Sequence, residues 1–90
     1  MAGRVVFSVR SPLGYRVTLT RDRWREIVRY KHPALAGNEQ AVRGCVQRPT
    51  VVRESVKDPT VHMYYGIEGR VRLCVVVAPV NADDRFVVTA

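Results

Sequence analysis

Apolar and polar positions alternate with a period of two near the start of the chain, in "RVVFSVRSPLGYRVTLT". This period is typical of strands with one buried face, and it predicts strands at about residues 4–9 and 15–19. The stretch between them, Ser11-Pro12-Leu13-Gly14, is rich in turn-forming residues. The chain is therefore expected to begin with a β-hairpin.

The pattern then changes to a helical period, which predicts a helix from about residue 21 to 31. Thr20 offers an N-cap hydroxyl, and the helix should end near His32, because Pro33 disfavours the α conformation of the residue before it. The apolar stripe of this helix is formed by Trp24, Ile27, Val28 and the aliphatic part of Lys31.

A second helix is expected from about 39 to 48, with Asn38 as its cap and Pro49 as its stop. The period then returns to two, which predicts four strands with short connections, and short connections favour antiparallel pairing. These strands are expected at 50–56, 61–67, 71–80 and 85–90. The predicted fold class is α+β, a single domain over residues 1–90 with an N-terminal hairpin, two helices and then a four-stranded antiparallel sheet.

The net charge of +7 is concentrated in one half of the chain. Residues 1–48 carry ten basic and three acidic residues, whereas residues 49–90 carry five of each. Arginine supplies thirteen of the fifteen basic residues, and its planar guanidinium binds phosphate in a bidentate manner. This favours a polyanionic partner such as RNA, with Arg21, Arg25, Arg29 and Arg53 as candidate contacts. The alternative for the line of arginines on the first helix is a solvated basic surface.

The two cysteines and the length of the apolar runs indicate which cofactors and which location in the cell to expect. Cys45 and Cys74 are the only cysteines, and they lack the spacing of a metal site, so both are expected to be buried thiols and no cofactor is expected. The longest uncharged apolar run, "LCVVVAPV" at 73–80, is shorter than a membrane span requires. These features predict a soluble, cytoplasmic protein without a membrane partner.

Several side chains with catalytic chemistry fall on the predicted strands. Arg53 and Ser55 share one strand face, and Tyr64 shares a face of the next strand with His62. Together with His32, these groups would hold the base, the acid and the cation that RNA cleavage without metal requires. Each has a structural alternative: His32 as a helix-stop residue, Tyr64 as a sheet aromatic, and Arg53 as the partner of a carboxylate.

An ordered set of short motifs carries a resemblance to a known family. They are "VTLTRDRWREIVRYKHPAL", "VQRPTVVRES", "MYYG", "LCVVV" and the closing "VVTA". In this order they resemble the phage-type branch of the barnase, EndoU, colicin and RelE-like (BECR) nucleases. The resemblance covers residues 17–90, and the chain departs from it by stopping at Ala90, where relatives continue.

The resemblance implies a BECR-like fold and a metal-independent endoribonuclease that cleaves tRNA or mRNA by attack of the 2′-hydroxyl. It also implies a toxin whose partner is an antitoxin protein. Its functional positions fall on His32, Arg53, Ser55 and Thr89, with Tyr64 as a weaker addition. The alternatives are a non-catalytic RNA-binding domain of the same fold and a phage-associated interaction domain.

Overall fold

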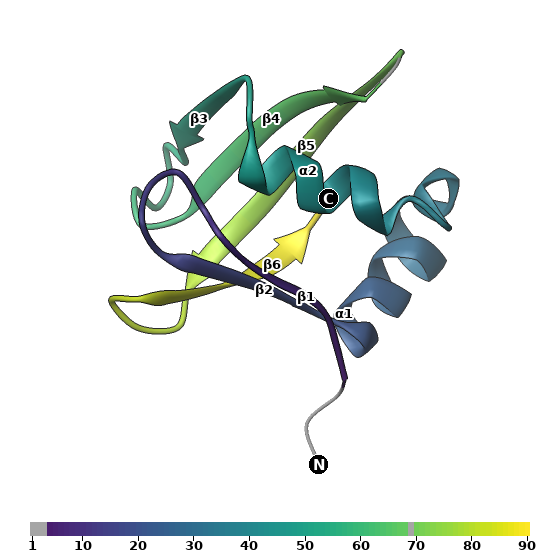
Figure 1. The fold of residues 1–90 in the computed structure, drawn as a ribbon, viewed down its shortest axis with the longest axis horizontal. Coiled ribbons are helices and arrows are strands. Elements are labelled where there is room, and N and C mark those ends of the chain that lie inside the picture. Colours follow the sequence, from purple (N-terminus) through teal and green to yellow (C-terminus); the bar gives the residue numbers. More distant parts are fainter. Residues whose placement is uncertain (1–3, 69) are drawn as a thin grey trace.

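A computed structural model describes residues 4–68 and 70–90. Within these residues, the strands form one six-stranded sheet in the order β1-β2-β6-β5-β4-β3, and the helical segments pack against it (Figure 1). The strands are β1 (Val5–Arg10), β2 (Arg16–Thr20), β3 (Val51–Glu54), β4 (His62–Glu68), β5 (Val71–Pro79) and β6 (Asp84–Thr89).

The N-terminal hairpin belongs to the same sheet as the later strands. β2 pairs with β6 in parallel, with Val17 opposite Arg85 and Thr18 opposite Phe86, whereas the other neighbouring strands are antiparallel. The prediction of a separate four-stranded antiparallel sheet is therefore wrong, and the sheet is six-stranded and mixed. Alternation identifies a strand and its faces, but it does not specify which distant strand lies beside it.

The two faces of the sheet differ in burial. One face, here called the covered face, carries the buried strand residues and packs against the helices. Its members include Phe7, Val9, Val17, Leu19, Tyr64, Leu73, Val75, Val77 and Val87. The other face, here called the open face, carries half-buried and exposed side chains. Its members include Arg53, Met63, Val76 and Thr89 in one cross-strand row, and Val51, Tyr65 and Cys74 in the next.

The first predicted helix consists of two different kinds of helix. The α-helix α1 (Arg21–Glu26) begins as expected, because the Thr20 hydroxyl accepts a hydrogen bond from Arg23 N at 3.3 Å. From Ile27 to Lys31 the chain instead forms a π-helix, η1, whose wide turn closes with His32 N donating to Ile27 O at 2.7 Å. Arg21, Arg25 and Arg29 are all exposed, and Arg25 and Arg29 still line one pocket beside Trp24 and Val28.

The remaining helical segments complete the covered layer. A short 3-10 helix, η2 (Pro33–Leu35), follows His32, and α2 (Glu39–Gln47) buries Val42, Cys45 and Val46. Asn38 occupies the N-cap position of α2, but its side chain does not cap this helix; its amide donates to Ala34 O at 3.3 Å. Cys45 is buried as expected, whereas Cys74, on the open face, is only half-buried, and both thiols are free.

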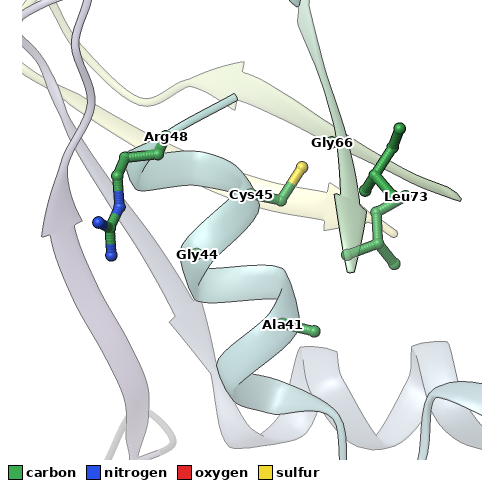
Figure 2. Close-up of a pocket in the computed structure, with 7 residues that line it drawn as sticks. Ala41, Gly44, Cys45, Arg48, Gly66 and Leu73 are labelled. Carbon is green, nitrogen blue, oxygen red and sulfur yellow. The ribbon is translucent and has the colours of Figure 1, made fainter. Parts of the chain in front are cut away.

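A small cavity of about 220 Å³ separates part of α2 from β4 and β5 (Figure 2). Cys45 extends from α2 toward the strand that carries Gly66, whereas the Arg48 side chain extends away from it (Figure 2). The Cys45 thiol donates to Tyr64 O at 3.4 Å, and burial, with a smaller effect of Cys74, raises the pKa of the Cys45 thiol to about 11. The thiol therefore remains protonated near neutral pH and acts as a packing group.

Replacing either of two glycines beside this cavity by alanine is expected to change the stability of the fold, in opposite directions. In Gly66→Ala the new Cβ would lie 2.9 Å from Cys45 Sγ, so we expect a loss of about 1–3 kcal/mol of stability from overpacking. In Gly44→Ala the new Cβ meets nothing within 4 Å on a helix, so we expect a gain of about 0.5–1 kcal/mol. Urea unfolding measures both.

The contact with Cys45 can be tested separately. Adding Cys45→Ala removes the sulfur that the new methyl group approaches, so the loss in the double variant should be smaller than the sum of the two single losses. Strictly additive losses would contradict the close approach of Gly66 to Cys45.

Candidate functional site

His32 lies at the edge of an open cavity of about 450 Å³. It occupies the C-cap of η1 with φ −140° and ψ 75°, outside the helical region, as expected for a residue before proline. The cavity lies between this turn and β5, and its walls come from three segments. The lining residues are Lys31, His32, Pro33, Ala34 and Leu35, then Arg72, Leu73 and Cys74, and finally Ala90.

The lining combines positive charge with an apolar floor. Lys31, His32 and Arg72 are exposed at the cavity, whereas Leu35, Leu73 and Ala90 are buried. Such a cavity fits a ligand with an anionic part and a flat apolar part, which is the chemistry of a nucleotide. The sequence analysis did not single out Arg72, although a lone charged residue inside the apolar run of β5 was the available signal.

Arg53 and Thr89 lie in one row across the open face. Arg53 is opposite Met63 on β4, Met63 is opposite Val76 on β5, and Val76 is opposite Thr89 on β6. Three strand spacings separate Arg53 from Thr89, about 14 Å. They can contact different parts of one extended ligand, but not the same atom. Thr89 directly precedes Ala90, a lining residue of the His32 cavity.

The structure does not bring Ser55 and Tyr64 to this row. Tyr64 is opposite Val52 and lies on the covered face, where it is fully buried. Ser55 follows the end of β3, and its N–H donates to Val61 O at 2.9 Å in the connection to β4. The set proposed from sequence is therefore divided: Arg53 and Thr89 share the open face, His32 lies in the turn between η1 and η2 beside β5, and Tyr64 and Ser55 lie elsewhere. The catalytic roles of all five remain predictions.

The Tyr64 hydroxyl takes part in a hydrogen-bond chain that the sequence analysis did not predict. Tyr64 donates to the Tyr15 hydroxyl, Ser11 Oγ also contacts Tyr64, and the Tyr15 hydroxyl lies 2.7 Å from His62 Nδ1. Because each hydroxyl has only one proton, Ser11 donates to Tyr64, and Tyr15 can donate to His62 Nδ1 when that nitrogen carries no proton. A neutral His62 with its proton on Nε2 fits this arrangement.

The environment of His62 in this hydrogen-bond chain predicts how the stability of the fold depends on pH. Burial lowers the pKa of His62 below its ordinary value of 6.5, and Arg85 lowers it further, while Glu54 acts in the opposite direction. The unfolded chain therefore takes up a proton near pH 6.5, whereas the folded protein takes it up only at lower pH. Stability should be highest above pH 6.5 and should fall as the pH decreases from 6.5 through the lowered pKa of His62.

Thermal unfolding between pH 8 and pH 5 measures this effect. A His62→Gln variant keeps an acceptor for Tyr15 but does not titrate, so its melting temperature should change less over this range. Hydrogen bonds from Thr60 hold the pKa of Asp58 below its ordinary value of 3.8, so Asp58 changes the pH dependence of stability only below this pH range. Equal pH profiles for the two proteins would contradict the assignment to His62.

The surface near His32 is strongly basic. Arg21, Arg25 and Arg29 are exposed on α1 and η1, in the segment that leads to Lys31 and the cavity. Within residues 4–68 and 70–90, the only ion pair is between Arg23 and Glu26, at 3.4 Å. Most of the fifteen basic side chains are therefore not neutralised within the described part of the chain. This leaves them available to an anionic partner.

Among the residues that the structure describes, the helices are too short and too polar to cross a membrane. No protein family, curated protein or solved structure was found to match the chain.

Proposed function

We propose that this protein binds RNA and cleaves it without a metal ion. The observation that supports the proposal best is the His32 cavity, in which a histidine, two cations and an apolar floor meet beside an arginine-rich helix. Lys31 and Arg72 would hold the phosphate of the scissile bond. The apolar floor would hold a base or a ribose.

In the proposed reaction, His32 accepts the proton of the RNA 2′-hydroxyl. The 2′ oxygen then attacks the phosphorus, the bond to the 5′ oxygen breaks, and that oxygen takes a proton from solvent. The products are a 2′,3′-cyclic phosphate and a free 5′-hydroxyl. Histidine suits this role because it exchanges protons near neutral pH, and the neighbouring cations stabilise the charge that develops on the phosphate oxygens.

The experiment is to incubate fluorescently labelled RNA of mixed sequence with protein purified under denaturing conditions and refolded, in the presence of EDTA. Refolding from denaturant removes a co-purified inhibitor. We expect cleavage with cyclic-phosphate ends, and binding that weakens steeply as salt is raised from 50 to 200 mM. Salt-sensitive binding without cleavage would instead favour a non-catalytic RNA-binding domain. Absence of both binding and cleavage would contradict the proposal.

A further inference from the structure

The His32 cavity adjoins a second cavity on the open face. This second cavity, of about 170 Å³, is lined by Thr50, Val51, Tyr65, Gly66, Ile67, Arg72 and Leu73. Arg72 and Leu73 line both cavities, so the two meet at the start of β5, one toward the η1–η2 turn and the other toward β4 and β3. Arg72 is exposed and shares the open face with Tyr65, so a ligand that leaves the His32 cavity past Arg72 reaches that face.

Tyr65 lies in an apolar part of the open face. It is opposite Val51 on β3 and Cys74 on β5. Val51 is 41% exposed, and Ile67, two residues further along β4, is 63% exposed. An aromatic ring beside exposed aliphatic side chains offers a surface on which a flat ring can stack.

The charge of the open face indicates what kind of partner fits. Its strands present Arg10, Arg16, Arg53 and Arg72, and within the described residues Asp84 is the acidic residue that shares this face. Two copies of the chain meeting through this face would bring the same positive charges together, which is unfavourable. A polyanion with apolar rings satisfies both the arginines and Tyr65.

We infer that the substrate is single-stranded RNA, which passes from the His32 cavity over Arg72 onto the open face and reaches Tyr65 and Arg53, with an unpaired base stacked on the Tyr65 ring. This inference rests on the proposed function and specifies its substrate class. In a duplex the bases are stacked on one another and paired, so they do not reach an aromatic side chain on a sheet surface. In a single strand they do.

Fluorescence anisotropy with a labelled single strand, and with the same strand annealed to its complement, tests the inference at fixed salt in EDTA. Tyr65→Ala should weaken binding of the single strand by about 5- to 150-fold, the effect of losing one stacked base. Tyr65→Phe should retain the affinity, because stacking needs the ring and not the hydroxyl. Val80→Ala is the control, since Val80 is 64% exposed in the turn between β5 and β6 and lines neither cavity.

A charge substitution gives a second test that does not depend on the folding of Tyr65→Ala. Ile67→Glu adds a negative charge beside Tyr65 and should also weaken single-strand binding, whereas Val56→Glu, at a 99% exposed position between β3 and β4, should not. The inference is wrong if both test variants bind like the original protein, or if the duplex binds as tightly as the single strand. It is also wrong if Ile67→Glu changes the solution mass and not RNA affinity, because the face is then an interface between copies. Failure of the original protein to bind any RNA overturns the proposed function itself.

Discussion

His32→Ala is expected to slow RNA cleavage by about 10²- to 10⁴-fold, the usual effect of removing a general acid or base. RNA binding should persist, because it depends on the arginines and not on the imidazole. The backbone of His32 donates to Ile27 O and accepts from Leu35 N, and these bonds are unaffected by the substitution. The exposed ring can therefore be removed without loss of the turn around it.

Single-turnover cleavage in EDTA, together with anisotropy of the same labelled RNA, measures the two effects separately. His62→Gln is the matched control, because it replaces the other histidine of the protein, which is hydrogen-bonded to Tyr15. This variant should cleave RNA within a few-fold of the original rate. Arg53→Ala should weaken both binding and cleavage. If His32→Ala cleaves normally while Arg53→Ala abolishes cleavage, His32 is only the residue that ends the helix.

Tyr64→Phe is expected to destabilise the fold by about 1–3 kcal/mol. The Tyr64 side chain is fully buried, and its hydroxyl bonds both Ser11 and Tyr15. Without this hydroxyl, the buried hydroxyls of Ser11 and Tyr15 each lose one hydrogen-bond partner. For a domain of this size, each kcal/mol lowers the melting temperature by about 4–8 °C, so the effect is measurable by thermal unfolding.

The neighbouring tyrosine provides the control for this substitution. The Tyr65 hydroxyl lies on the open face and donates to Met63 Sδ at 3.7 Å, a weak contact, so Tyr65→Phe should change stability little. Equal losses in the two variants would contradict the hydrogen-bond chain. Loss of cleavage in Tyr64→Phe, measured well below its melting temperature, would instead support the catalytic role that the resemblance implies for Tyr64.

Much of the local structure could be predicted from the sequence. The strands lie within one or a few residues of the expected ranges, Thr20 caps α1, and the alternation correctly placed Tyr64 and His62 on the same face of β4. These features depend on residues that are close in the chain, so their period is visible without knowing the fold. The concentration of arginine in the first half was visible in the same way.

The tertiary structure decided which of these elements meet. The parallel pairing of β2 with β6, the contact of Ser11 with Tyr64, and the meeting of His32 with Arg72 at one cavity all join residues far apart in the chain. The change from α-helix to π-helix at Ile27 likewise could not be predicted from the local pattern. Which segments pair depends on the packing free energy of the whole core, because several strands have similar local patterns and could pair with one another. By itself, therefore, the sequence determined the elements and which strand residues share a face, whereas the packing of the complete fold determined which face of the sheet is buried and where the candidate site lies.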